Sequence, residues 1–393
     1  MDWSVSLVAW GPPAAQTTFS GYASRLHNEL ARAGHLRSSF DAKDIRPTDA
    51  LRGAIILRPN GPLPTPGISR RWLWSERGCE TLTRRLHQKI RAAGDFGPFL
   101  EVGTVARIDP ELGPHYQIID MTIAQAHAAG FFGFKSFSDR EIEAARAVQT
   151  ETLRRAKHVF AFTDWARESV HRDCGVPWER ISVVYSGPNF EAPDRAPRPR
   201  KAQQILFIGY DWVRKGGPLL LEAFRIVRKA LPQAELLIVG PGPGVEEPGV
   251  VLAGRIDRRT SEGYERICTI YSEASCLCLP SSFDPFPIAI LDAMTFGTPV
   301  VAFDNGSRKE AVVAGVTGQL APEGDVEALA EALISILSNV DLRDSMSAAS
   351  LARSLALFTW KGVVERIGKV VAEPSPAART APVSTVLRDV TAC

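Results

Sequence analysis

The segment 276–302 reads CLCLPSSFDPFPIAILDAMTFGTPVVA and decides the fold of the last third of the chain. It begins and ends with short apolar runs, and both have the composition of buried strands. The residues between them are expected to form a helix, so the segment predicts a strand, a helix and a second strand of a parallel sheet. Asp284 then follows the first strand on a loop, and Asp292 lies in the first turns of the helix.

Two carboxylates therefore flank the carboxyl end of a predicted strand, with seven residues between them. Ligands of open α/β sheets bind in the crevice at this end of the strands, and helix N-termini at that place attract phosphate. The pair suggests a ligand that has hydroxyl groups at both ends and phosphate between them. A nucleotide sugar has this shape.

Each carboxylate also has a structural explanation. Asp284 is a preferred N-cap residue, and Pro285 after it suits the first position of a helix. Asp292 shares a helical face with Ile288 and Phe296, so its charge requires a partner, which ribose hydroxyls or a buried arginine would supply. We favour the ligand interpretation for both carboxylates.

A second motif, in the segment 204–218, reads QILFIGYDWVRKGGP. It predicts a strand, a turn that contains glycine, and a helix with proline in its first turn. Arg214 and Lys215 would then stand at a helix N-terminus, where two cations oppose the helix dipole unless an anion lies between them. A diphosphate held by both side chains and by free backbone N–H groups would be such an anion. A solvated basic turn is the alternative.

The whole chain has 393 residues, of which 45% are apolar and 23% charged, and its formal net charge is +2. This length predicts two domains of a soluble globular protein, and the small charge argues against nucleic acid as a main partner. The start, MDWSVSLVAW, is expected to be a first strand rather than a signal peptide, and no apolar run is long enough to span a bilayer. The six cysteines lack zinc-site spacing, and Cys276 and Cys278 alternate along a strand as small core residues, so we expect a reducing, cytoplasmic location.

Short β-rich runs alternate with helical patterns, which predicts parallel sheets covered by helices. In the first half we expect helices over 20–33, 71–93, 138–156 and 164–173, and strands near 4–10, 53–58, 97–102, 116–120, 158–163 and 181–185. In the second half we expect strands over 204–209, 235–240, 275–280 and 300–303. The predicted domains are 1–186 and 204–357, with a linker over 187–203, a helix over 358–372 and a tail over 373–393 of disorder-prone composition.

These motifs together resemble the retaining GT-B glycosyltransferases of family 4, the glycosyl transferases group 1. The resemblance is specific over 204–360 and weaker over 157–189, and it rests on the basic turn, the two carboxylates and the segments GPGPG, GRI and LPSS at 240–244, 254–256 and 279–282. It implies two Rossmann-like α/β domains that face each other across a cleft, the first binding an acceptor and the second a nucleotide sugar. It also implies that the helix over 358–372 returns to the first domain.

The resemblance implies roles for individual residues of the second domain. Arg214 and Lys215 would stabilise the leaving diphosphate, Asp284 would hold hydroxyl groups of the donor sugar, and Asp292 would bind the ribose. Gly242 and Arg255 would border the base. The other donor-binding candidates are Gly209, Gly216, Phe286, Pro287 and Ile288.

The chain departs from the family pattern in two places. The family pair of carboxylates is generally two glutamates, whereas Asp284 and Asp292 are each one methylene shorter. Pro287 replaces a residue whose N–H often contacts the sugar. Members usually need no metal, because cationic side chains and a helix dipole act on the diphosphate, so we expect neither a metal site nor a cofactor.

In the first domain, Asp120 ends a predicted strand at a position where many family members carry a histidine that faces the donor sugar. By this resemblance Asp120 would contact the sugar or the acceptor and belong to the catalytic group; capping of the following turn is an equal alternative. No general base is required, because in a retaining front-face reaction the departing phosphate can accept the acceptor proton. Gly21 and His115 are further candidates on the acceptor side, although turn geometry and a structural role explain them as well.

The segment 70–91 is basic, and it contains two tryptophans and an apolar stripe. Such a helix can lie on an anionic membrane, which would place the protein peripherally at the inner face of that membrane. We favour the alternative, in which the stripe packs on the first sheet. The stripe consists of Cys79, Leu82, Leu86 and Ile90.

The resemblance implies a reaction: transfer of a hexose from a nucleotide diphosphate sugar to a hydroxyl of a glycan, lipid or small-molecule acceptor, with retention of anomeric configuration. Two alternatives remain open. One is a nucleotide-sugar epimerase of the same fold, and the other is a catalytically silent partner protein that only binds the nucleotide sugar.

Overall fold

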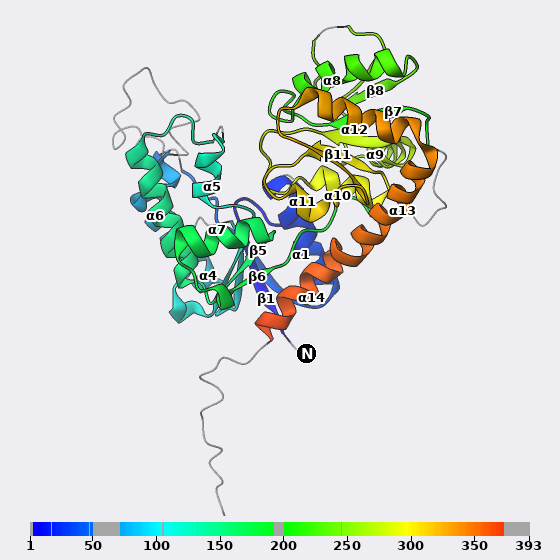
Figure 1. Ribbon diagram of the computed structural model, residues 1–393. Coiled ribbons are helices and arrows are strands. Elements are labelled where there is room, and N and C mark those ends of the chain that lie inside the picture. The colour runs from blue at the N-terminus through cyan, green and yellow to red at the C-terminus, as the bar shows by residue number, and fades with distance from the viewer. Residues whose placement is uncertain are drawn as a thin grey trace, which may run out of the picture.

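The computed structural model describes residues 3–16, 18–46, 48–49, 71–103, 106–131, 133–191, 200–244 and 246–372. The strand expected near 53–58, most of the linker after Glu191, and the tail over 373–393 lie outside the described residues. Figure 1 shows two bodies, each with a parallel sheet covered by helices, which confirms the expected α/β class.

The first domain is built on a parallel sheet of six strands in the order β2-β1-β3-β4-β5-β6. Strand β2 was not expected: it lies at the edge of this sheet, and of its side chains only Phe40 is buried. Five strands lie near their expected positions. The six are β1 (Val5–Ala9), β2 (Leu36–Asp41), β3 (Phe99–Val102), β4 (His115–Ile119), β5 (His158–Ala161) and β6 (Ile181–Val183).

The helices of the first domain begin at side-chain caps wherever a polar residue precedes them. Ser138 and Thr122 each form a capping box with the residue three positions later, and Thr163 accepts a hydrogen bond from Ala166 N. The helices are α1 (Tyr22–Arg32), α4 (Glu76–Ala92), α5 (Ile123–Ala128), α6 (Asp139–Arg155) and α7 (Asp164–Cys174), with 3-10 turns at Thr18–Gly21, Pro110–Leu112 and Trp178–Arg180.

The segment 70–91 packs inward, as we favoured; Arg70 lies outside the described residues. The α4 residues Leu86 and Ile90 belong to one buried cluster with Val8 and Phe40, so the stripe covers the first sheet. Arg85 is also buried and pairs with Asp49, with 2.6 Å between Nη1 and Oδ2. No helix in the described part of the chain has the length and apolar composition needed to cross a membrane.

The second domain is built on a second parallel sheet, in the order β12-β11-β10-β7-β8-β9. Its strands are β7 (Gln204–Ile208), β8 (Glu235–Val239), β9 (Val250–Gly254), β10 (Cys276–Leu279), β11 (Val300–Phe303) and β12 (Gly318–Ala321). Its helices, which end in the connection to the first domain, are α8 (Gly217–Ala230), α9 (Ser261–Glu273), α10 (Ile288–Thr295), α11 (Arg308–Ala311), α12 (Val326–Ser338), α13 (Val340–Leu357) and α14 (Trp360–Val371).

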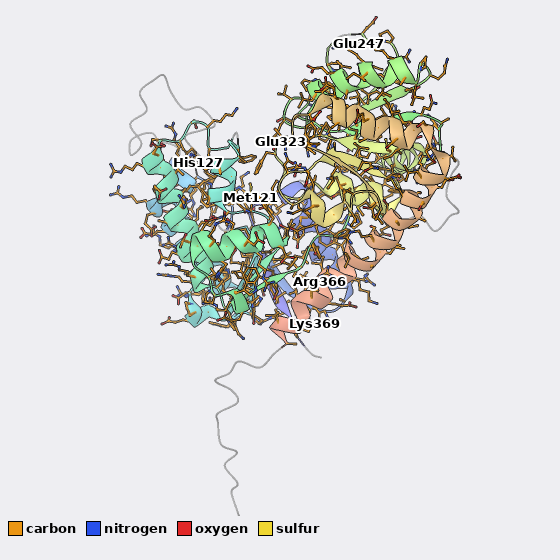
Figure 2. All side chains as sticks on the ribbon, in the orientation of Figure 1. Met121, His127, Glu247, Glu323, Arg366 and Lys369 are labelled. Carbon is orange, nitrogen blue, oxygen red and sulfur yellow. The ribbon has the colours of Figure 1, made fainter. Side chains whose placement is uncertain are left out.

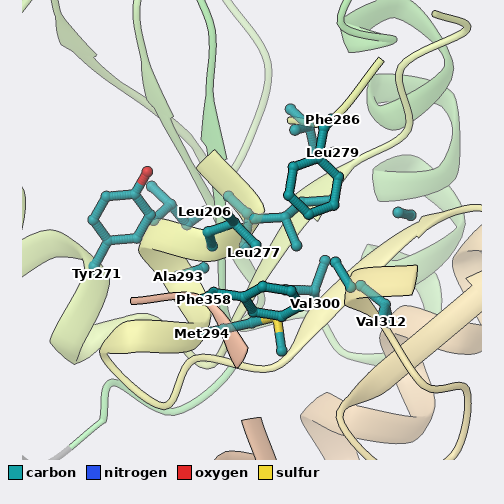
Figure 3. Packing of buried hydrophobic residues seen from close by; sticks show 14 of the residues in the cluster. Leu206, Tyr271, Leu277, Leu279, Phe286, Ala293, Met294, Val300, Val312 and Phe358 are labelled. Atoms are coloured by element: carbon teal, nitrogen blue, oxygen red, sulfur yellow. The ribbon is translucent and has the colours of Figure 1, made fainter. Parts of the chain in front are cut away.

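The core of the second domain lies on both faces of its central strands. Figure 3 shows Leu206 and Leu277 of neighbouring strands close to Ala293 and Met294 of α10, and all four side chains are fully buried. Strands buried on both faces are apolar throughout, which is why these strands were recognised from sequence. Cys276 and Cys278 are fully buried on β10, as expected of small core residues.

The last two helices connect the domains. Figure 1 shows α13 and α14 running from the second domain back to the first, where α14 packs on α1. Trp360 Nε1 donates a hydrogen bond of 2.7 Å to Pro188 O, and Arg366 donates from Nε and Nη2 to Val184 O, at 3.0 and 2.8 Å. These hydrogen bonds therefore fix α14 to the segment after β6 at the junction of the two domains.

Candidate functional site

The second sheet reverses its strand order between β7 and β10. From β7 the chain continues through α8 to β8 on one side, and from β10 it continues through α10 to β11 on the other side. The loops that follow β7 and β10 therefore diverge and leave a crevice at the carboxyl ends of these two strands, where ligands of such sheets bind. These are the loops that carry the basic turn and Asp284.

At this point the structure brings the basic turn and Asp284 together. Lys215 Nζ donates to Asp284 Oδ2, and Arg214 Nη1 lies 3.8 Å from the same oxygen. Arg214 also donates to Phe283 O at 3.3 Å and pairs with Asp211, at 3.3 Å between Nε and Oδ2. The sequence separation between Lys215 and Asp284 is 69 residues, so the cluster of two cations and two carboxylates is a product of the fold.

Glycine at position 216 allows this close approach. Gly216 has a φ of +81° and precedes α8, and a Cβ at this position would lie 1.9 Å from Pro280 O on the β10 side. A residue with a side chain would push the two loops apart. Gly209 packs in the same way against the aliphatic part of Lys215, since a Cβ there would lie 3.0 Å from Lys215 Cγ.

The helix after Asp284 begins later than an N-cap role for Asp284 requires. α10 starts at Ile288, and Pro287 at its N-cap makes no side-chain capping hydrogen bond. The capping explanation of Asp284 is therefore wrong, because three residues separate it from the start of the helix. Phe286, Pro287 and Ile288 lie at this N-terminus, whose N–H groups carry partial positive charge toward the crevice.

Asp292 has a partner that neither sequence interpretation named. Its two carboxylate oxygens accept hydrogen bonds from Asn189 N, at 2.6 Å, and Asn189 Nδ2, at 3.2 Å. The residue is buried, and this burial raises the pKa of its carboxyl group to about 6, against the opposing effect of the Asn189 hydrogen bonds. Asp292 therefore ties the segment after β6 to α10, and its contact with ribose stays a prediction.

The candidates for the base region lie at the ends of the next strands. Gly242 follows β8, and a Cβ there would lie 2.5 Å from Leu252 Cδ2 of β9. Arg255 directly follows β9, and its guanidinium group lies 5.6 Å from the ring centre of Tyr210. Tyr210 follows β7 and is 64% exposed. Sequence reasoning missed this tyrosine, although an exposed aromatic residue next to the basic turn is a recognisable signal.

Asp120 faces this cluster from the first domain. It directly follows β4, and the charge of Asp284 is one of the causes that raise its pKa, which lies at about 7. The larger cause is burial; hydrogen bonds from the N–H groups of Asp120 and Met121 act in the opposite direction. Figure 2 shows Met121 on the side of the first domain that faces the second. Asp120 therefore lies beside the charged cluster while Thr122 caps α5, and the contact of Asp120 with a sugar or an acceptor stays a prediction.

An aromatic contact also joins the two domains here. The rings of Phe131, in the loop after α5, and Phe283, next to Asp284, have centres 5.5 Å apart. Phe131 lines a cavity of about 310 Å³ at the carboxyl end of the first sheet, and Asp120 lies at its wall. The first domain thus presents an apolar cavity beside the charged cluster of the second.

The two acceptor-side candidates lie at opposite ends of the first sheet. His115 begins β4, the strand that Asp120 follows, and its Nε2 is hydrogen-bonded to Glu101 Oε2 at 3.1 Å. It is buried at the opposite end of the strand, so the structural explanation of His115 holds and its assignment to the acceptor side is corrected. Gly21 precedes α1 with a φ of +93°, and a Cβ there would lie 3.0 Å from Asn189 Oδ1, so it belongs to the domain junction.

No group of three or more histidine, cysteine, aspartate or glutamate side chains suited to a metal ion occurs among the residues that the structure describes. The charged groups that the structure brings together at the crevice include the four of the cluster, Asp120, and Arg308, whose pKa is lowered by burial against the opposing effect of the Asp284 charge. These groups can bind an anion and accept hydrogen bonds from hydroxyl groups.

Comparisons with known proteins point to one family. Residues 202–339 match the family model described as "Glycosyl transferases group 1". The phosphatidyl-myo-inositol mannosyltransferase of Mycobacterium leprae is 34% identical over 189 residues, which are 46% of this chain and 49% of that protein. The chain thus spans about half the length of the curated relatives that it matches first.

Solved structures match over nearly the whole chain. Sucrose-phosphate synthase from Thermosynechococcus elongatus has a TM-score of 0.65 at 19% identity, and the match covers 94% of this chain and 98% of that one. Anabaena HepE, solved in complex with UDP and glucose, has a TM-score of 0.61 at 15% identity, with 94% and 100% covered. The chain therefore has the GT-B fold, and its residues 202–339 are similar to the glycosyl transferases group 1.

Proposed function

We propose that the protein is a retaining glycosyltransferase that moves a hexose from a nucleotide diphosphate sugar to a hydroxyl group of an acceptor. The observation that carries this proposal is the contact of Lys215 and Arg214 with Asp284 at the switch point of the second sheet. Cations beside a carboxylate suit a ligand that carries phosphate next to hydroxyl groups. The complex of HepE with UDP and glucose supports a donor of this class.

In the proposed reaction the diphosphate competes with Asp284 for the two cations. A bound diphosphate draws Lys215 and Arg214 toward it, and the Asp284 carboxylate becomes available to the hydroxyl groups of the donor sugar. Cleavage of the bond between the anomeric carbon and phosphate moves negative charge onto the leaving diphosphate. The cations and the N-terminus of α10 stabilise this charge more in the transition state than in the ground state.

Asp120 accepts a hydrogen bond from the acceptor hydroxyl as the acceptor binds, and so places the hydroxyl oxygen near the anomeric carbon on the face that carries the leaving group. As the bond to phosphate breaks, the hydroxyl proton leaves this hydrogen bond for the departing phosphate, and the new glycosidic bond forms on the same face of the sugar. In this reaction side chains and backbone N–H groups neutralise the charge of the leaving diphosphate. We therefore propose that the protein is active without a divalent metal. EDTA at millimolar concentration should leave the rate unchanged; loss of activity that magnesium or manganese restores would refute metal independence.

The first experiment is a thermal-shift panel of UDP-, GDP- and ADP-hexoses. A ligand that binds only the folded protein raises its unfolding temperature, so the panel identifies the base and sugar. Release of nucleoside diphosphate with and without acceptor then separates the alternatives. Release that depends on acceptor, with an α-product from an α-donor, supports retaining transfer. An altered sugar without release indicates an epimerase, and binding without any turnover indicates a silent partner.

A further inference from the structure

The cavity at the carboxyl end of the first sheet has aromatic and aliphatic walls. Trp10 follows β1, Met121 follows β4, and Trp74 lies in the turn before α4. Phe131 and Phe134 come from the loop between α5 and α6. Four segments that are distant in sequence thus contribute large apolar side chains to one space of about 310 Å³, a volume within the range of small-molecule pockets.

The aromatic walls form a continuous series that reaches the donor loop. Ring centres lie 6.3 Å apart for Trp74 and Phe134, 6.4 Å apart for Phe134 and Phe131, and 5.5 Å apart for Phe131 and Phe283. Phe283 precedes Asp284 in the chain. A flat ring held in this series would therefore lie beside the loop that carries the charged cluster.

The oxygen-bearing side chains at the cavity wall differ in whether they can accept a hydrogen bond from a ligand. Thr122 Oγ1 shares a hydrogen bond of 2.6 Å with Ser169 and accepts from Gln125 N at 3.1 Å. Gln149 Oε1 accepts from Ile123 N at 2.7 Å. Both side chains are thus committed to the start of α5, which leaves the Asp120 carboxylate as the acceptor for a ligand hydroxyl.

We propose that this cavity binds an aromatic acceptor, a ring system that bears a hydroxyl group, and presents that hydroxyl to Asp120; the proposal rests on the proposed function. A sugar ring in the same space would turn most of its hydroxyl groups toward apolar walls, and each unpaired group has a desolvation cost. A long alkyl chain would find no partner for the quadrupoles of four aromatic rings, whereas a flat ring packs edge or face against them.

The test measures binding and transfer separately. Binding of 2-naphthol to the full chain is followed by calorimetry without donor. Hexose transfer is then compared for 2-naphthol, 1-decanol and methyl α-D-mannoside, with the donor chosen by the thermal-shift panel. We expect 2-naphthol to bind and to have the highest kcat/KM of the three acceptors.

Variants of the cavity wall make the test specific. Trp74→Ala should raise the Kd of 2-naphthol and its acceptor KM about tenfold, because the ring contacts are lost. Trp74→Phe should keep both values within about threefold of the wild type, since it preserves an aromatic wall. The KM for the donor should stay unchanged in both variants. Arg84→Ala, on the exposed face of α4, is the matched control and should change nothing.

Each other outcome is decisive. Preference for 1-decanol or for the mannoside, or 2-naphthol binding that is insensitive to Trp74→Ala and to Phe134→Ala, would overturn the aromatic assignment. Phe134→Ala also replaces Trp74→Ala as the probe if the latter does not fold. Binding of 2-naphthol that Trp74→Ala weakens, together with no hexose transfer to any acceptor, would support the cavity assignment and count against the proposed function.

Discussion

The carboxyl ends of the two sheets present different chemistry although both sheets are parallel and both end in loops that face the site. The second sheet offers charge: Lys215, Arg214 and Asp284 meet within its crevice. The first offers shape: an apolar cavity with Asp120 at its wall. The difference shows that the sheets supply equivalent positions, while the residues on the loops decide what is bound there.

The strand orders differ as well. The second sheet has its reversal between β7 and β10, so the two loops that diverge there carry the cations and the carboxylate. In the first sheet the reversal lies between β1 and β3, and Asp120 follows the next strand, β4. The proposed donor side thus has its charges at the reversal itself, whereas the first domain has its carboxylate at the neighbouring strand end, although Trp10 at the reversal also lines the cavity.

The largest expected effect concerns the charged side. Lys215→Ala should lower kcat about a hundred- to thousandfold with little change in the donor KM, because the lysine acts on charge that develops on the leaving diphosphate. Asp284→Ala should lower kcat to a similar extent, since this carboxylate orients the sugar. Steady-state kinetics with Arg225→Ala, which is exposed on α8, as control would show this. An increase in KM alone would mean that Lys215 only binds the donor.

A smaller effect is expected on the apolar side. Asp120→Asn should lower kcat/KM about ten- to hundredfold at pH 8, because it replaces a charge-assisted hydrogen bond to the acceptor by a neutral one. With a pKa of about 7 for Asp120, the wild-type kcat/KM should rise as the pH increases through 7, since only the ionised form is a full acceptor. The variant should lose this rise. A rise that persists in Asp120→Asn would assign it to another group.

Loss of Asp292 should lower the stability of the protein as well as its affinity for the donor. Asp292→Ala removes both acceptors of Asn189 and leaves half-buried N–H groups unpaired, which lowers the unfolding free energy by about 1–3 kcal/mol. It should also raise the donor KM more than it lowers kcat, as a ribose contact would. Asn189→Ala is the matched variant: it should lower stability in urea without changing the donor KM. Equal donor KM in Asp292→Ala and the wild type would limit Asp292 to the junction.

A smaller effect is expected on how the free energy of unfolding depends on pH. Burial raises the pKa of Asp120 to about 7 and that of Asp292 to about 6, from an ordinary value of 3.8 for an aspartate. Between pH 4 and 7 the folded chain therefore retains protons that the unfolded chain has lost, so these groups make the protein less stable as the pH rises. Urea unfolding at several pH values should show a shallower decline for Asp120→Asn. An identical slope in the variant would contradict the raised pKa.

The smallest effect is expected at α4. Its apolar stripe is buried on the first sheet and Arg85 is paired with Asp49, so peripheral contact through 70–91 would have to use exposed residues such as Arg84. We expect no sedimentation of the protein with anionic liposomes at physiological salt, and no change in Arg84→Ala. Binding that disappears at high salt or in this variant would show that the helix contacts a membrane.

The strands that sequence reasoning missed share a position in the fold. β2, β9 and β12 each lie at an edge of a sheet among the described residues. The side chains of β9 are exposed or half-buried, and Val251 and Leu252 are exposed. Central strands such as β10 are buried on both faces and read as apolar runs. The edge strands β2 (LRSSFD) and β12 (GQLA) have no such run and give a weaker signal, whereas β9 (VVLAG) is apolar in sequence although none of its side chains is buried.

The sequence by itself determined the α/β class, the family resemblance of 204–360, and the place of Lys215 and Asp284 at strand ends, because these depend on local periodicity and on short motifs. Only the tertiary structure decided that Asp292 meets Asn189, that His115 lies at the far end of β4, and that Trp10 and Trp74 share a cavity with Phe131. Each of these depends on contacts between distant segments, where packing and the pairing of buried polar groups select the partner.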